Sequence, residues 1–268
     1  MSRTRPLAIF STFLLRLLAL TVTAASEELE HPDPDDVWNT WTIPEIQSDW
    51  LKCWERDVSV PSPIYSSETW MSLREEYHSV MESSYDSNAS PDYYDGFSVN
   101  FETKFNTEKG RRANYALNDI PEGTLIWKST YTAAFRDGSS YRHFLRRMSP
   151  TMACDVMSLA YTRRDVDGLV TACVDLDAGS FTNGGDTEEE LNIALRDGHP
   201  SDTGCDLEFY ATRDIREGEE LAVDYYSFAM GDHGWVEMGL YSEEALEYPD
   251  EYGEEEQYYE EEVTETEF

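Results

Sequence analysis

The cysteines and histidines are the first residues to consider for chemistry. The chain has 268 residues, and its four cysteines are Cys53, Cys154, Cys173 and Cys205. In an oxidising compartment they allow two disulfides with three connectivities, whereas in a reducing compartment they are expected as buried thiols. No two of them have the C-x-x-C spacing of a zinc site, so no metal site is expected. His199 and His233 have no Ser or Cys partner at an informative spacing and are interpreted as ordinary surface or loop residues.

Two other side chains depend on the sequence around them for their interpretation. Taken alone, Tyr225 is a strand tyrosine beside Val223, and Asn183 is a turn residue, because Asn-Gly is a common turn dipeptide. Tyr225, however, closely follows one copy of a repeated phrase. YALNDIPEGTLI begins at Tyr115 and YATRDIREGEEL at Tyr210, with six identities in nine positions and a spacing of 95 residues. Each copy predicts a strand, a turn and a strand, with glycine supplying the backbone freedom of the turn.

These phrases resemble two blocks of the SET domain, the protein-lysine methyltransferase fold. The late block, YATRDIREGEELAVDY at 210–225, is similar to the family's A-x-R-D-I-x-x-G-E-E-L followed by D-Y. The early block, KGRRANYALNDIPEGTLIW at 109–127, resembles the family's G-x-G, F-A and D-I-x-x-G. Between them, DAGSFTNGGDTEEELNIAL at 177–195 resembles the loop that carries N-H-S. The resemblance covers about 97–230, roughly half of the chain.

The early and middle blocks also depart from the family pattern. Gly184 and Gly185 replace the His and Ser that follow the matching Asn183. Asn192 is the candidate for the second Asn of the block, after a loop about three residues longer than usual. In the early block, Arg112 and Ala113 stand where the second Gly of G-x-G is expected.

The resemblance implies an S-adenosylmethionine-dependent methyltransferase that acts on lysine side chains of a basic protein substrate. The methyl group passes directly to a neutral amine, so orientation and electrostatic placement supply most of the acceleration. Tyr225 is the implied catalytic residue and also contacts the cofactor, while Phe228 or Trp235 could close the channel. The other implied cofactor-binding residues are Gly110, Arg111, Arg112, Asn183 and Gly184. The alternative, favoured by the departures, is a catalytically inactive SET-like fold that serves as a protein-binding module.

The implied fold is mainly β with α insertions: a SET-type β-clip with knot-like C-terminal threading around Asn183, plus acidic extensions. Strands are expected at 97–105, 125–127 and 168–176. A mostly helical insert is expected at 139–161, broken near Pro150. A further helix is expected in SSETWMSLREEYHSVMESS, with Ser67 as a possible N-cap and Trp70 and Leu73 on its apolar face.

Four segments are predicted along the chain. Residues 1–25 are interpreted as a signal or targeting peptide, because Arg3 and Arg5 precede an apolar run and no acidic residue occurs before Glu27. This favours the secretory pathway or secretion. Arg16 interrupts the run and leaves organelle import, to a mitochondrion or plastid, or a plain extension as alternatives. The run is too short for a stable membrane span. An acidic, aromatic-rich N-terminal extension follows at 26–96, then the SET-like domain at 97–230, and then an acidic, disordered tail at 231–268.

The charge of the chain restricts its partners. The chain has 55 acidic and 20 basic residues, a net charge of −35. Direct nucleic-acid binding is not expected, because it needs clustered Lys and Arg. The same charge attracts a basic protein or peptide. From Ser242 onward there are 13 acidic residues and no Lys or Arg, a composition typical of disorder.

Overall fold

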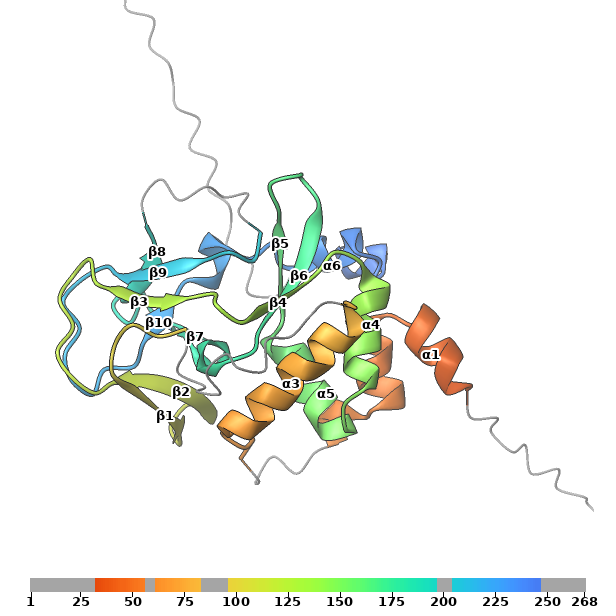
Figure 1. Cartoon of the computed structure of the whole chain (residues 1–268), viewed down its shortest axis with the longest axis horizontal. Coiled ribbons are helices and arrows are strands. Elements are labelled where there is room, and N and C mark those ends of the chain that lie inside the picture. Colours follow the sequence, from red (N-terminus) through yellow and green to blue (C-terminus); the bar gives the residue numbers. More distant parts are fainter. Residues whose placement is uncertain (1–31, 56–60, 83–95, 197–203, 247–268) are drawn as a thin grey trace, which may run out of the picture. The chain divides into compact units, whose positions relative to one another are not determined.

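Figure 1 shows the computed structural model of the chain, which describes residues 32–55, 61–82, 96–196 and 204–246. The α-helices in these ranges are α1 Pro34–Thr40, α2 Ile43–Glu45, α3 Ser67–Val80, α4 Gly138–Arg146, α5 Pro150–Leu159 and α6 Asp232–Glu237. The strands are β1 Phe101–Asn106, β2 Arg111–Ala116, β3 Leu125–Lys128, β4 Thr132–Phe135, β5 Tyr161–Arg164, β6 Val170–Asp175, β7 Asn183–Gly184, β8 Ile193–Leu195, β9 Glu208–Ala211 and β10 Ala222–Val223. Shorter helical turns include η2 Cys53–Glu55, η3 Ala178–Phe181 and η4 Tyr225–Ser227. The fold is mainly β with helices, and the predicted helical insert is confirmed as α4 and α5, which are separated before Pro150.

The two copies of the repeated phrase pair with each other. Ile120 and Ile215 exchange two backbone hydrogen bonds, each of 2.8 Å. The aspartate of each copy caps the turn of the other: Asp119 accepts from the amide of Glu217 at 2.9 Å, and Asp214 accepts from the amide of Glu122 at 3.0 Å. Equivalent positions of the two copies lie 95 residues apart, so each of these bonds has a counterpart with donor and acceptor copies exchanged.

The glycines of the repeated phrase follow the same exchange. Gly123 donates to the carbonyl of Ala211, and Gly218 donates to the carbonyl of Ala116, both at 2.8 Å. Both glycines have positive φ, 77° and 87°, which non-glycine residues adopt only with strain. The predicted strand-turn-strand elements are therefore present. The Ala, Asp, Ile, Glu and Gly that the two copies share make bonds across the pair.

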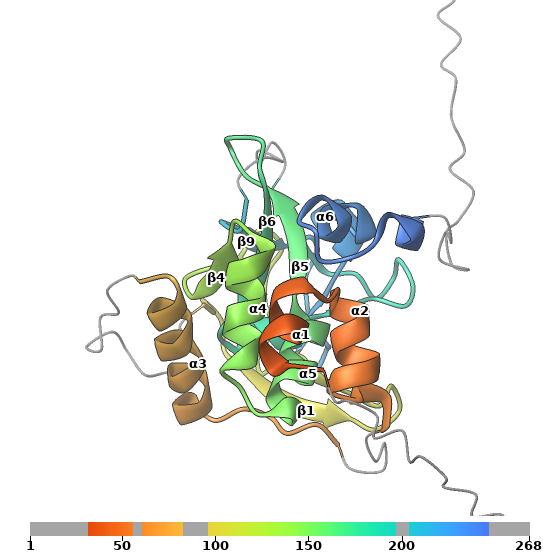
Figure 2. The ribbon, with the colours of Figure 1, turned by 90° about the vertical axis from the view of Figure 1, so that its right-hand side faces the viewer.

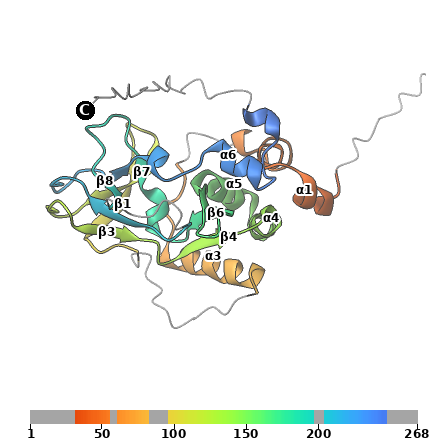
Figure 3. The same ribbon diagram turned by 90° about the horizontal axis from the view of Figure 1, so that it is seen from above.

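The strands form sheets in the orders β1-β2, β3-β9-β8-β10-β7 and β4-β6-β5. In the five-stranded sheet β10 lies between β7 and β8 and is parallel to both, with Ala222 opposite Asn183 and Val223 opposite Gly184 and Ile193. This order brings the end of the late block beside the middle block. Figure 3 shows β4 and β6 beside α4, away from β1, β3 and β8.

The N-terminal segment shares a core with the middle of the chain. Trp38, Tyr65 and Trp70 are buried there with Phe135 and Phe144, so these aromatic residues of the segment pack onto the core. Helix α4 contacts α1, α3 and α5, and Figure 2 shows the four helices close together. The predicted N-cap needs a correction of one residue. The cap of α3 is Ser66, whose hydroxyl accepts from the amide of Thr69, so Ser67 is the first helical residue.

The boundary of the acidic tail also needs a correction. The sequence places it at residue 231, yet α6 follows directly and Leu240 is fully buried in the same core. Gly234 in α6 approaches Thr162 so closely that any Cβ would collide with its hydroxyl. Charge composition does not reveal these contacts, because α6 is short and its one buried residue is a glycine. Residues 247–268 and the targeting segment 1–25 lie outside the described residues.

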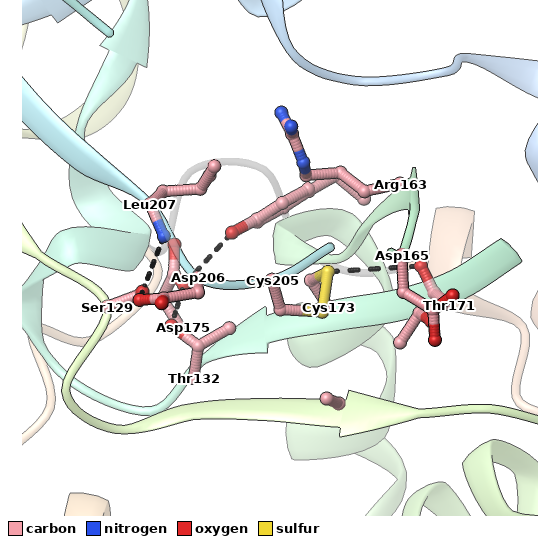
Figure 4. Close-up of a disulfide and its surroundings, with 12 residues drawn as sticks. Ser129, Thr132, Arg163, Asp165, Thr171, Cys173, Asp175, Cys205, Asp206 and Leu207 are labelled. Atoms are coloured by element: carbon pink, nitrogen blue, oxygen red, sulfur yellow. Dashed lines mark hydrogen bonds between the residues drawn. A yellow bond between two sulfur atoms is a disulfide. The ribbon is translucent and has the colours of Figure 1, made fainter. Parts of the chain in front are cut away.

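Both possible disulfides are present in the structure. Cys53 in η2 is joined to Cys154 in α5, and Cys173 in β6 is joined to Cys205, which precedes β9 (Figure 4). Of the three connectivities allowed by the sequence, the structure has this one. The first bond ties the N-terminal segment to α5 of the insert, and the second ties β6 to the segment that precedes β9.

Candidate functional site

Tyr225 lines a small cavity that we call the aromatic cavity, of about 40 Å³. Its lining residues are Trp127, Leu159, Tyr161, Asp175, Gly179, Ser180, Thr182, Ile193, Phe209, Val223, Tyr225 and Phe228. The ring of Phe228 contacts those of Tyr161, Tyr225 and Phe209 at centroid distances of 5.4, 5.8 and 5.2 Å. Aromatic pairs favour such tilted and edge-on contacts. Phe228 thus lines the aromatic cavity beside Tyr225, whereas Trp235 packs on Tyr141 and Tyr241.

The hydroxyl of Tyr225 has a defined position. It donates to the carbonyl of Thr182 at 2.8 Å, and its ring lies against Gly184, where an added Cβ would come within 3.2 Å of it. One part of the side chain faces solvent, since the residue is 45% exposed. The hydroxyl end is desolvated, and this burial raises its pKa to about 12. At neutral pH the group is therefore a neutral hydroxyl that both donates and accepts hydrogen bonds.

A second cavity, of about 240 Å³, lies next to the first, and we call it the arginine cavity. Its lining residues are Ser62, Phe105, Gly110, Arg111, Arg112, Asp155, Ser158, Leu159, Ser180, Phe181 and Asn183. Leu159 and Ser180 line both cavities. The structure thus brings together four of the residues implied as cofactor-binding, and it places Tyr225 across a shared wall from them. Gly184 lines neither cavity and instead packs under the Tyr225 ring.

Asn183 joins three parts of the chain through its side-chain amide. Nδ2 donates to the carbonyl of Arg112 at 2.7 Å, to the Glu220 carboxylate at 3.2 Å and, at a longer 3.4 Å, to the carbonyl of Phe181. These bonds hold β7 against β2 and against the late block. Asn192 has a comparable role: it is buried, donates to the carbonyl of Glu220 and accepts from the amide of Ala222.

Arg112 is part of a buried ion pair in the wall of the arginine cavity. Its guanidinium makes two bonds to the Asp155 carboxylate, at 2.8 and 2.9 Å, and one to the carbonyl of Pro63 at 2.9 Å. Tyr65 also donates to Asp155. The guanidinium lies 4.2 Å from the centroid of the Phe181 ring. Where the family pattern has a glycine, this chain therefore has a cation that is neutralised internally.

Arg111 lines the same cavity and has one unpaired donor. One of its terminal nitrogens donates to the carbonyl of Gly184 at 3.0 Å, and the guanidinium lies 3.5 Å from Glu220. Its Nε is buried, and within the described ranges no acceptor reaches it. A buried donor without a partner costs about 1–3 kcal/mol. Gly110 beside it has φ of 67°, and nothing lies within 4 Å of the position of a Cβ. Backbone conformation, and not space, thus requires glycine there.

These observations allow a test of whether S-adenosylmethionine fits the arginine cavity. Pockets for ligands of this size usually have about 300–1,000 Å³, so 240 Å³ is slightly small. The guanidinium of Arg111, which lines the cavity, can donate to a carboxylate or a ring nitrogen, and the cofactor offers both. The Arg112–Asp155 pair lies in the wall with its charge already compensated. The residues present therefore fit the cofactor.

Sequence reasoning missed Asp175, the one charged residue among those that line the aromatic cavity. Its Oδ1 accepts from the Thr132 hydroxyl at 2.6 Å (Figure 4). The same oxygen accepts from the Tyr161 hydroxyl at 3.2 Å. The sequence signal for Asp175 was a single carboxylate near the end of the apolar run GLVTACVDL. Every residue from Val170 to Asp175 in this run is buried. Burial raises the pKa of Asp175 to about 6 and that of Asp177 to about 7.

His233 is exposed on α6, as expected of a surface residue, and His199 lies outside the described residues. In the part of the chain that the structure describes, every helix is too short or too polar to cross a membrane.

Comparisons with known proteins give weak likenesses. No family model matches the chain, and no curated protein matches it. Among solved structures, a Polycomb Repressive Complex 2 from Chaetomium thermophilum has a TM-score of 0.37 and 17% identity over 63% of this chain and 21% of that chain. An apo form of the complex with mutations in Ezh2 has a TM-score of 0.36 and 17% identity over 59% and 19%. KRYPTONITE, in complex with mCHH DNA, an H3(1-15) peptide and SAH, has a TM-score of 0.30 and 16% identity over 48% and 24%.

The chain thus spans about a fifth to a quarter of the length of the chains it matches. Such low scores and identities carry no conclusion about function.

Proposed function

We propose that this chain is an S-adenosylmethionine-dependent methyltransferase that acts on lysine side chains of a basic protein substrate. One observation carries the proposal. The cavity lined by Gly110, Arg111, Arg112 and Asn183 shares a wall with the aromatic cavity that Tyr225 lines. Two cavities in contact are what a transfer between a bound cofactor and a separately bound amine requires.

Each residue has a role that its contacts support. Arg111 binds an acceptor group of the cofactor through its guanidinium, which lines the cavity, and Asn183 fixes the backbone of Arg112 and the Glu220 carboxylate around it. When bound, S-adenosylmethionine supplies an electrophilic methyl group. Tyr225 orients the amine, because its neutral hydroxyl is held by the carbonyl of Thr182 and can accept a hydrogen bond from the amine. Placement of this kind accounts for much of the acceleration in transfer reactions.

The substrate class follows from charge. With a net charge of −35, the chain attracts a basic segment and disfavours nucleic acid. A lysine-rich peptide satisfies both the charge and the narrow aromatic cavity.

A second candidate is an inactive SET-like fold that binds proteins. The buried Arg112–Asp155 pair favours it, because a large paired side chain stands where the family pattern has glycine. The replacement of the family's His and Ser by Gly184 and Gly185 favours it as well.

Calorimetry with S-adenosylmethionine tests the proposal on the full chain with both disulfides formed. We expect binding that Arg111→Met weakens at least tenfold, whereas the exposed Arg216→Met leaves it unchanged. Tyr225→Phe should retain binding but lose methylation of basic lysine peptides, followed by mass spectrometry. Absence of binding at millimolar cofactor refutes the proposed methyltransferase activity. Binding without methylation of any lysine peptide supports the second candidate.

We also propose that the chain enters the secretory pathway, with organelle import as the alternative. The leader and the two disulfides support this, because disulfides persist in oxidising compartments. A fluorescent fusion to residues 1–40 tests it, and accumulation of that fusion in mitochondria or plastids would favour import. In the secretory pathway, the enzyme would need cofactor delivered to that compartment.

A further inference from the structure

Asn114 is a buried polar residue of β2 that lines neither the aromatic cavity nor the arginine cavity. Its side chain is fully buried. Its backbone carbonyl accepts from the amide of Leu221 at 2.8 Å, four residues before Tyr225. Strand β2 also contacts η3, the short turn that leads into Thr182 and Asn183. Asn114 therefore lies where the early, middle and late blocks meet.

The side-chain amide of Asn114 is fully hydrogen-bonded. Its Oδ1 accepts from the hydroxyl of Thr103, its cross-strand partner on β1, at 2.6 Å. Its Nδ2 donates to the carbonyl of Ala178 at 2.8 Å and to the hydroxyl of Thr182 at 3.1 Å. Both amide protons and the amide oxygen thus have partners, as buried polar groups require. These partners also fix the orientation of the amide, because a rotated amide would place its oxygen against the Ala178 carbonyl.

The two acceptors of Nδ2 lie at the two ends of η3. Ala178 is the first residue of this turn, and Thr182 is its C-cap. The hydroxyl of Thr182 accepts from Asn114, and the carbonyl of the same residue accepts from the Tyr225 hydroxyl at 2.8 Å. Thr182 thus links the Asn114 amide to the Tyr225 hydroxyl. A displacement of Thr182 would move the acceptor of the Tyr225 hydroxyl with it.

The direction of the Tyr225 O–H bond depends on this acceptor. A phenol has a single O–H donor, so the group that accepts from it sets the direction of the proton and leaves the oxygen lone pairs for another donor. The ring of Tyr225 is placed separately, by its packing on Gly184 and by the Phe228 ring at a centroid distance of 5.8 Å. Ring position and hydroxyl direction therefore have different supports.

We propose that Asn114 is a positioning residue for Tyr225. Its amide holds both ends of η3, and the Thr182 carbonyl then directs the Tyr225 O–H bond. The consequence for catalysis rests on the proposed function, whereas the placement of the hydroxyl rests on these contacts alone. Asparagine suits this position because one planar group supplies two donors and one acceptor. Leucine has a similar size but makes none of these bonds, and aspartate would bring a buried charge and no donors.

The test follows the Tyr225 hydroxyl by NMR on the full chain, with both disulfides formed and without cofactor. Tyrosines are labelled with ¹³C at Cζ, and the resonances are assigned with Tyr225→Phe and Tyr226→Phe. In Asn114→Leu at neutral pH, we expect the Tyr225 resonance to move toward that of Tyr226, which is 88% exposed and serves as the solvent reference. Tyr77→Phe is the matched control. It removes hydrogen bonds to the backbone of Ala134, away from η3, and should leave the Tyr225 resonance unchanged.

A second variant keeps the proposal testable if Asn114→Leu does not fold. Thr182→Val removes the hydroxyl that accepts from Asn114 but keeps the carbonyl that accepts from Tyr225. The Tyr225 resonance should again move toward that of Tyr226, by less than in Asn114→Leu, because the bond to Ala178 remains. A Tyr225 resonance that stays in place in Thr182→Val overturns the proposal, and so does an equal movement in Tyr77→Phe.

Kinetics separate this inference from the proposed function. In an active enzyme, Thr182→Val should lower kcat at least about tenfold and leave KM for a lysine peptide nearly unchanged, because the hydroxyl orients the reacting group and does not bind the peptide as a whole. A moved Tyr225 resonance in a chain that methylates no peptide refutes the methyltransferase and leaves the positioning role intact. Methylation by Thr182→Val at the wild-type kcat refutes the positioning role in catalysis and leaves the proposed function intact.

Discussion

Among single substitutions of buried residues near the site, Asp155→Ala should cause the largest loss of stability. Arg112 and Asp155 are 8% and 7% exposed and form two bonds, at 2.8 and 2.9 Å. In Asp155→Ala the guanidinium remains buried against the Phe181 ring with one carbonyl as its partner, and the Tyr65 hydroxyl loses its acceptor. Breaking such a pair from one side costs about 3–5 kcal/mol, because an uncompensated charge stays in the interior.

Thermal and urea unfolding of wild type, Asp155→Ala, Arg112→Met and the double variant measure this cost. For a domain of this size, we expect the single Asp155 variant to lower the Tm by about 6–20 °C. The double variant should recover most of the loss, because both charges are gone and Met fills part of the space. All samples stay oxidised, since Cys154 adjoins Asp155. A loss within 0.5 kcal/mol for Asp155→Ala, at unchanged m-value, refutes the assignment of a buried and dependent ion pair.

Three other predictions concern stability. The double variant Cys53→Ser/Cys154→Ser should lose up to about 4.7 kcal/mol in thermal or urea unfolding, because this bond closes a loop of 101 residues; Cys173→Ser/Cys205→Ser, with a separation of 32, should lose about 1 kcal/mol less, and the opposite order would contradict the loop argument. Asp119→Ala and Asp214→Ala should each cost about 1 kcal/mol and together less than their sum, since the two caps support one turn pair; strictly additive losses in a double-mutant cycle would argue against that coupling. The burial-raised pKa of Asp177 means that its contribution to stability is fully present below its unfolded value of 3.8 and is lost as pH rises through about 7. Asp177→Asn should therefore gain stability relative to wild type between pH 4 and pH 8, and a constant difference across that range would contradict the shift.

Local pattern allowed much of the fold to be predicted. The helix beginning at Ser67 and the break before Pro150 follow from spacing and from proline chemistry, which act over a few residues. The site residues were found through the blocks, and the structure brings Gly110, Arg111, Arg112 and Asn183 to one cavity. No pattern could predict that Arg112 pairs with Asp155, because the two lie 43 residues apart and each alone is an ordinary charged residue. Asp175 escaped for the related reason that its importance comes from the rings around it.

The repeated phrase shows how a distant contact can nevertheless leave a signal in sequence. A turn that bonds to a copy of itself imposes the same demands on both copies: an aspartate to accept from the partner's amide, an isoleucine to pair, and a glycine with positive φ. The six shared identities include these positions, and the three variable ones do not take part in the bonds that the copies exchange. Because β10 follows the second copy directly, this pairing also fixes where Tyr225 emerges relative to Asn183. A one-residue shift of the pair would displace Tyr225 from both Thr182 and the aromatic cavity, so the repeat constrains the site even though none of its residues lines it.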